Sequence, residues 1–164
     1  MKAHFEMMAA YNAWANARLY DAAAEMSDEV RKAPAGAFFD SLYGTLSHLL
    51  MGDRAWMRRF DGEGPPVTAL TDWPYEAFDD LRAAREAMDA RISRYVEGLS
   101  EAVLDEEMTV TLIVLSKTVT TPRHEALSHL FNHQTHHRGQ CHHMLTAAGR
   151  DAPPLDLFFF RIAA

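Results

Sequence analysis

Apolar residues recur at steps of three and four along four stretches of the chain, a period that places them on one face of an α-helix. From these stripes we predict helices over residues 2–26, 39–60, 72–99 and 122–148. Pro34 and Gly36 break the chain after the first helix, and the glycine–proline run 62–66 ends the second.

Local signals fix the ends of the last two helices. The third should begin near Pro74, because proline suits the first turn of a helix. Thr121 is the predicted N-cap of the fourth helix, with Pro122 at its first position and Gly149 as its stop.

Residues 108–121 are instead dense in β-branched side chains, which favours an extended segment or a small hairpin that turns near Ser116 and Lys117. A hairpin of this size is marginal alone and must pack on the helices. We therefore predict an all-α fold, a four-helix bundle with a small extended or hairpin segment before the last helix. The tail 153–164 carries three consecutive phenylalanines, which we expect to pack back on the bundle or across a subunit interface.

Length and charge narrow the class of protein. A chain of 164 residues is the size of one domain, taken as 1–164. A net charge of −7 with scattered basic residues argues against a nucleic-acid partner. Since no apolar run approaches the roughly 20 residues of a membrane span, we expect no membrane partner. The N-terminus lacks the apolar core of a signal peptide and Cys141 is the single cysteine, so we expect a cytoplasmic protein.

Histidines supply the candidate chemistry: the chain has nine, and six lie between His129 and His143. His133 and His137 are four apart in a predicted helix, so their imidazoles stack on one face about 6 Å apart along the axis. A divalent ion needs at least three such ligands, so the third must come from another helix. His48 is the best candidate, because it lies mid-helix between apolar positions where a charged imidazole is unfavourable.

The neighbours of His48 on its own helix face are all small, which lets another helix approach closely or leaves room for a ligand. They are Ser41, Gly44, Thr45, Gly52 and Ala55.

A metal-free interpretation of these histidines stays open. A single interior histidine is more often a hydrogen-bonded core residue than a ligand, and a pair four residues apart also occurs by chance. We interpret His129 as a hydrogen-bonded packing residue one turn before the site. His136 and Gln140 are candidate partners for the second ring nitrogen of a ligand.

Other polar residues receive structural interpretations. Cys141 is expected to be a buried packing thiol. Asp53 and Arg54 are expected to form a solvated or interfacial pair, and His4 and His124 to lie at the surface.

Three stretches resemble the signature segments of the DinB family of metalloenzyme-like proteins. They are YNAWANARLYDAAAEMSDEV (11–30), GAFFDSLYGTLSHLLMGDRAWMRRFDGE (36–63) and HLFNHQTHHRGQCHHMLTAAG (129–149). The resemblance implies an up-down-down-up four-helix bundle that binds a divalent metal through three histidines, which match His48, His133 and His137 here. Several members of the family associate as dimers, so it also implies a homodimer.

The resemblance further implies a small-molecule substrate, because members studied as enzymes include transferases and isomerases that use low-molecular-weight thiols. A three-histidine site keeps a coordination position open for substrate or water. We therefore expect a metal-dependent thiol S-transferase that uses zinc or nickel, with iron as an alternative. A metal-dependent hydrolase is a chemically close alternative, although no carboxylate is obviously placed as its general base. A non-catalytic metal-binding stress or interaction protein is the competing class.

Overall fold

The computed structural model describes residues 1–69, 71–112 and 116–163. Within these residues the chain is mostly helical, with seven helices and one two-stranded sheet. The four long helices are α1 (Lys2–Ala24), α3 (Leu42–Asp61), α4 (Phe78–Glu97) and α6 (Arg123–Ala147). The shorter elements are α2 (Asp28–Lys32), α5 (Glu101–Asp105), α7 (Leu157–Ala163), β1 (Glu107–Leu112) and β2 (Lys117–Pro122).

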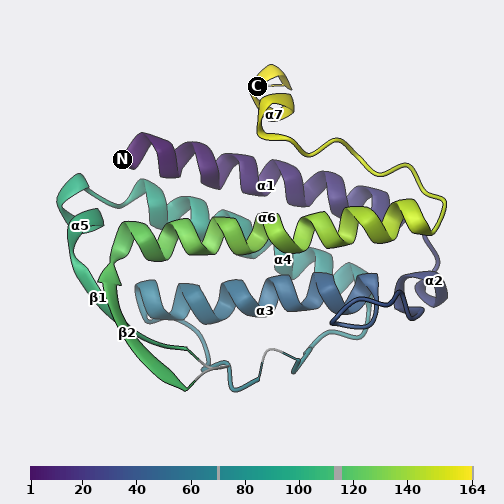
Figure 1. Cartoon of the computed structure of the whole chain (residues 1–164), viewed down its shortest axis with the longest axis horizontal. Helices are drawn as coiled ribbons and strands as arrows, with labels where there is room; N and C mark the ends of the chain where they lie inside the picture. The colour runs from purple at the N-terminus through teal and green to yellow at the C-terminus, as the bar shows by residue number, and fades with distance from the viewer. Residues whose placement is uncertain (70, 113–115, 164) are drawn as a thin grey trace.

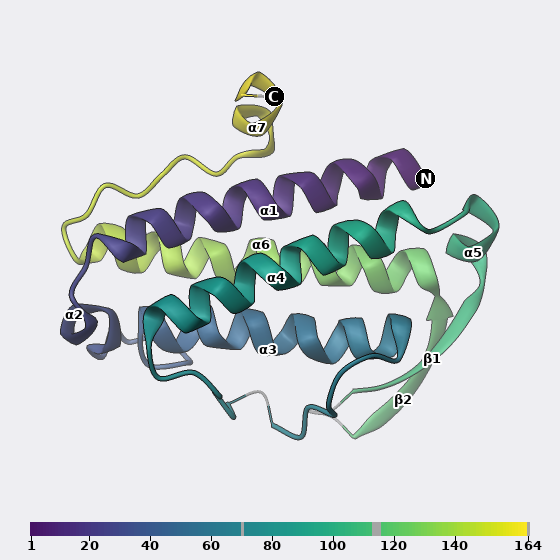
Figure 2. The same ribbon diagram turned by 180° about the vertical axis from the view of Figure 1, so that it is seen from behind.

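The four long helices lie side by side. Helix α1 packs on α4 and α6, and α3 packs on the same two helices. Helices α1 and α6 run in one direction and α3 and α4 in the opposite one, as the views from the two sides agree (Figure 1) (Figure 2). The arrangement makes α3 and α6, which carry the predicted metal ligands, direct neighbours.

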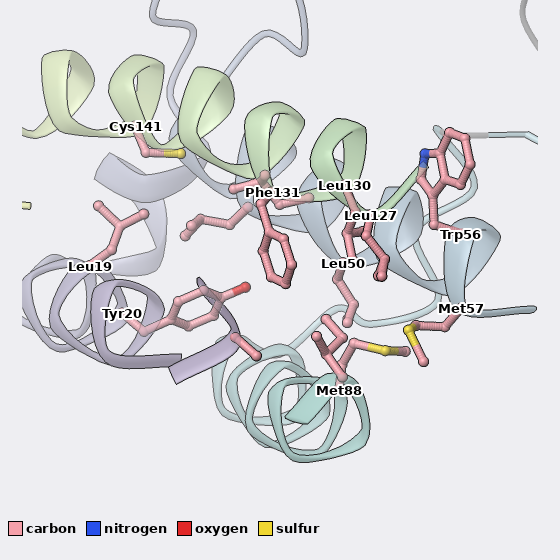
Figure 3. Packing of buried hydrophobic residues seen from close by; sticks show 14 of the residues in the cluster. Leu19, Tyr20, Leu50, Trp56, Met57, Met88, Leu127, Leu130, Phe131 and Cys141 are labelled. Carbon is pink, nitrogen blue, oxygen red and sulfur yellow. The ribbon is translucent and has the colours of Figure 1, made fainter. Parts of the chain in front are cut away.

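The apolar stripes of the long helices meet in one buried cluster. Leu19, Leu50, Met88 and Leu130, one from each long helix, belong to it (Figure 3). Burial of such side chains stabilises a fold by about 1.5–3 kcal/mol each. The predicted stripes therefore do face the core.

The second helix begins later than predicted, at Leu42 rather than at residue 39. Asp40 adopts a left-handed backbone conformation with φ 67°, which ends the preceding loop. The Ser41 hydroxyl then accepts a hydrogen bond from the Gly44 N–H at 3.1 Å and caps α3.

The prediction that the third helix starts near residue 72 is wrong, because α4 begins at Phe78. The preceding loop lies against α3 instead. There the Tyr43 hydroxyl donates to the Tyr75 carbonyl at 2.7 Å, and the Trp73 ring packs beside Gly44. These tertiary contacts outweigh the local preference of proline for a first helical turn.

The start of the last helix is also shifted. Thr121 lies in β2, so it is not the N-cap of α6, and its hydroxyl instead donates to the Glu125 carboxylate at 2.5 Å. Gly149, with φ 71°, follows the end of the helix as predicted.

The predicted hairpin is present as β1 and β2, which pair antiparallel from Glu107–Pro122 to Leu112–Lys117. Met108 and Val110 are buried and belong to the core cluster, so the hairpin packs on the helices as expected. Ser116, at the predicted turn, has φ 50°, while residues 113–115 lie outside the described residues.

The C-terminal tail packs back on α1 through one of its phenylalanines. The Phe160 ring lies 6.0 Å from Tyr11 and 5.7 Å from Trp14, and the Tyr11 hydroxyl donates to the Leu155 carbonyl at 2.7 Å. Phe158 is 81% exposed.

In the described part of the chain, no helix is both long enough and apolar enough to cross a membrane.

Candidate metal centre

The three predicted ligands come together in space. Nε2 of His48 lies 3.2 Å from Nε2 of His133, and one nitrogen from each of His48, His133 and His137 falls within 4.8 Å of the others. Among the described residues, this is the cluster of histidine, cysteine and carboxylate side chains with such spacing. Helix α3 supplies one ring and α6 supplies two.

Helix geometry and one glycine explain this meeting. The four-residue step on α6 places the His133 and His137 rings 4.5 Å apart between centroids. Gly52 lies opposite on α3, where an added Cβ would come within 2.9 Å of Cε1 of His133. The absence of a side chain at Gly52, one of the small residues noted in the sequence, therefore gives His133 room to approach His48.

Gln140 determines which ring nitrogen of His137 carries the proton. Nδ1 of His137 lies 2.8 Å from the side-chain oxygen of Gln140, which can only accept, so Nδ1 carries the proton. The lone pair of His137 is then on Nε2. Gln140 is thus the predicted partner of a ligand's second ring nitrogen, whereas Nε2 of His136 lies 3.2 Å from the Gln140 amide nitrogen and so contacts Gln140 instead.

Burial favours the neutral form of His133 and His137. Burial lowers the pKa of His133 to about 3, with positive charge on His137 and His48 acting in the same direction. Burial also lowers the pKa of His137, against the opposing effect of its bond to Gln140. Neutral imidazole is the form that binds a metal ion, so at neutral pH protons compete little for the ring nitrogens of His133 and His137.

The donor set fits a first-row divalent ion. Two imidazole nitrogens at about 2.0–2.1 Å from a tetrahedral zinc ion lie about 3.4 Å from each other. The 3.2 Å between the His48 and His133 nitrogens is close to this value. Three neutral imidazoles suit zinc, nickel or iron better than magnesium or calcium, which prefer oxygen ligands.

Phe39 is a component of the site that the sequence did not reveal. Its ring stacks on His48 at 3.7 Å between centroids and 17° between planes, and it makes a T-shaped contact with His137 at 5.7 Å between centroids. The sequence shows two adjacent phenylalanines before a helix cap, but nothing in it says which of the two faces the histidines.

Comparison with known proteins agrees with these observations. The model of the DinB family matches residues 1–164. The chain belongs to the DinB family. Among curated relatives, Protein DinB of Bacillus subtilis (strain 168) is 28% identical over 152 residues, which cover 89% of this chain and 87% of that protein.

A crystal structure of a DinB-like protein from Bacillus cereus ATCC 10987 has the same fold. It matches this chain with a TM-score of 0.64 and 19% sequence identity, over 88% of this chain and 90% of that one. At that identity the likeness supports the fold alone.

The remaining histidines near the site of this DinB-family chain are peripheral. His129 packs against Trp56 at 4.8 Å and the His133 ring at 6.0 Å between centroids. Its packing role is as expected, but its ring makes no hydrogen bond to any residue that the structure describes. His4 is exposed as predicted, whereas His124 is half-buried, with Nδ1 3.1 Å from the Leu104 carbonyl oxygen.

The expectation that Asp53 and Arg54 form a solvated or interfacial pair is wrong. Asp53 is 0% exposed and forms an ion pair with Arg85 at 2.6 Å, while Arg54 donates to the Tyr75 hydroxyl. Burial raises the pKa of Asp53, and the Arg85 guanidinium opposes that shift. The partner of Asp53 lies on α4, so nothing in the sequence around Asp53 reveals the pair.

This buried ion pair belongs to a polar network that reaches all four long helices of the DinB-family chain. Arg85 also pairs with Asp89 at 2.8 Å, and Asn16 of α1 donates to Asp89 at 3.0 Å. Arg138 of α6 donates to the Asn16 oxygen at 3.3 Å. Arg138 directly follows the candidate ligand His137, so the network lies one residue from the site.

Cys141 is fully buried, and burial raises the pKa of its thiol. It therefore packs as an inert side chain, as predicted.

Proposed function

We propose that this DinB-family chain binds one divalent transition-metal ion through His48, His133 and His137. The observation that carries the proposal is the meeting of three imidazoles from two helices, with His48 and His133 nitrogens 3.2 Å apart and all three within 4.8 Å. Zinc or nickel is the proposed ion, with iron as the alternative.

The chain prepares these ligands before an ion arrives. Gln140 accepts the Nδ1 proton of His137 at 2.8 Å and so orients Nε2 toward the cluster. Because the pKa of His133 is about 3, its ring is neutral at neutral pH and keeps one ring nitrogen free to bind an ion. A bound ion with three protein ligands supplies a Lewis acid that lowers the pKa of a small molecule held at its open position.

We further propose that the small molecule is a low-molecular-weight thiol and that the reaction is S-transfer to an electrophilic substrate. The cluster contains no carboxylate among the described residues, and the buried Asp53 is already paired with Arg85 at 2.6 Å. No carboxylate is therefore placed there as a general base for water, whereas a thiol, whose free pKa of about 8.5 is already far below that of water, is deprotonated more readily when the ion binds it. This favours thiol transfer over hydrolysis.

Elemental analysis of untagged protein purified without added metal tests the binding site. We expect about one equivalent of a transition metal in the wild type and none in His133→Ala. His143→Ala is the matched control on the same helix, because His143 is exposed, and it should retain the metal. An absence of metal in all three folded proteins would exclude the three-histidine site.

A turnover assay tests the chemistry separately. Wild type and His48→Ala are incubated with an electrophile and a panel of small thiols, and conjugate formation is followed. Loss of turnover in a folded His48→Ala protein supports catalysis. Metal binding without turnover of any thiol or hydrolysable ester would favour the non-catalytic role.

The proposal also covers the domain organisation, the cellular location and the oligomeric state. We propose that residues 1–164 form one up-down-down-up four-helix-bundle domain, present in the cytoplasm as a homodimer. Gel filtration with light scattering tests the oligomeric state.

A further inference from the structure

The loop between α2 and α3 places two adjacent phenylalanines in opposite environments. Phe39 is 8% exposed, whereas Phe38 is 89% exposed. A tight turn fixes this difference, because the Asp40 N–H donates to the Ala37 carbonyl at 2.9 Å and the Ser41 N–H to the Phe39 carbonyl at 2.8 Å. These backbone hydrogen bonds fix the conformation of the chain around Phe39 and so keep its ring in the buried position.

The Phe39 ring is the contribution of this loop to the histidine cluster. It lies nearly parallel to the His48 imidazole, with 3.7 Å between centroids and 17° between planes, and makes a T-shaped contact with His137 at 5.7 Å and 63°. Phe38 contacts the Phe39 ring at 4.9 Å. One aromatic ring therefore touches a candidate ligand from α3 and another from α6.

Gly44 allows the loop to sit so close to α3. A Cβ at this position would fall 2.1 Å from the Phe39 carbonyl oxygen, a distance that no side chain tolerates. Gly44 lies one helical turn before His48, and its N–H is capped by Ser41 at 3.1 Å. The loop and the cap therefore pack tightly against the first turns of α3, which carry His48.

We propose that Phe39 is a positioning residue of the metal centre. The outer torsion of a histidine side chain is broad and nearly two-fold, so an unrestrained ring can turn its carbon edge toward the ion. Stacking at 3.7 Å holds the His48 plane in the orientation that directs Nε2 toward Nε2 of His133. This role rests on the proposed binding of a metal by the three histidines.

Titration with Co²⁺, followed by its visible d–d absorption, tests the role. Phe39→Leu keeps an apolar side chain and removes the ring. We expect it to weaken Co²⁺ binding on the order of tenfold and to change the band positions and intensities. Two control variants should bind Co²⁺ with wild-type affinity and spectrum. Phe39→Tyr keeps an aromatic ring at the position, and Phe38→Ala removes only the exposed neighbour.

The outcomes separate this role from simple packing. A Phe39→Leu protein that unfolds at lower temperature but binds Co²⁺ with wild-type affinity and spectrum overturns the proposal. An equal loss in Phe38→Ala also overturns it, because the effect would then not depend on contact with His48. If Phe39→Leu does not fold, Phe39→Met is compared in the same way.

The wild type itself distinguishes the two proposals. If it binds no Co²⁺, the three-histidine site fails and the role of Phe39 fails with it. If it binds Co²⁺ and Phe39→Leu is unchanged, only the role of Phe39 is lost.

Discussion

At the scale of single residues, His133 couples protonation to folding. In the unfolded chain its imidazole takes up a proton near pH 6.5, whereas burial in the folded chain lowers its pKa to about 3. Between these values the unfolded state binds more protons. The free energy of unfolding therefore falls as the pH drops through this window, and it rises again toward neutral pH.

We therefore expect the chelator-treated protein to lose stability between about pH 6.5 and 4, and His133→Gln to lose less over the same range. Urea unfolding midpoints at several pH values measure the difference. His4→Gln is the control, since His4 is exposed and lies on α1, a helix that carries none of the three histidines of the cluster. Equal pH dependence in wild type and His133→Gln would contradict the expectation.

The sequence revealed those residues whose role depends on local spacing. His133 and His137 follow from a four-residue step, and His48 from its position between apolar neighbours. Phe39 and Asp53 could not be found in this way. The position of Phe39 depends on a left-handed turn at Asp40, and the partner of Asp53 is Arg85 on another helix.

At the scale of elements, the approach of α3 and α6 depends on Gly52. Gly52→Ala would push His133, because the new Cβ would lie 2.9 Å from its Cε1. We expect metal affinity to fall on the order of tenfold, since a ligand ring is displaced. Isothermal titration with Zn²⁺ measures the loss.

Gly139→Ala is the matched change on α6. A Cβ at Gly139 meets nothing within 4 Å, so this variant should gain about 0.5–1 kcal/mol of stability from helix propensity. Its metal affinity should equal that of the wild type. A similar loss of Zn²⁺ binding in both variants would show that glycine matters in these helices for another reason.

Some of the observed helix and strand boundaries could be predicted from local sequence signals, and others could not. The hairpin was predicted from the density of β-branched residues, and the end of α6 was predicted from Gly149. The start of α4 was not predicted correctly, because the loop before it makes contacts with α3 that no local sequence pattern encodes. The short helix α2, capped by Ser27, was also missed, since five residues are too few for an apolar stripe.

At the scale of the whole molecule, the buried polar network ties the four long helices together. Asp53→Ala would leave Arg85, which is 2% exposed, with one of its two carboxylate partners. Removal of one member of a buried ion pair destabilises a protein by about 3–5 kcal/mol. We expect a loss of this size in urea unfolding of Asp53→Ala.

Asp21→Ala provides the comparison at the surface. Asp21 pairs with Arg82 at 2.6 Å, but both side chains are substantially exposed. Its removal should change stability by less than about 1 kcal/mol. Equal losses in the two variants would mean that burial of the Asp53 pair adds nothing to its effect.

The ligands of the candidate metal centre differ in how far apart they lie along the chain. His133 and His137 are brought together by a single helical turn, whereas His48 is 85 positions from His133. Helix formation takes microseconds or less, while distant segments meet only when the chain completes its slower search. Two of the three ligands are therefore brought together as soon as α6 forms, and the third joins them only when α3 packs against α6.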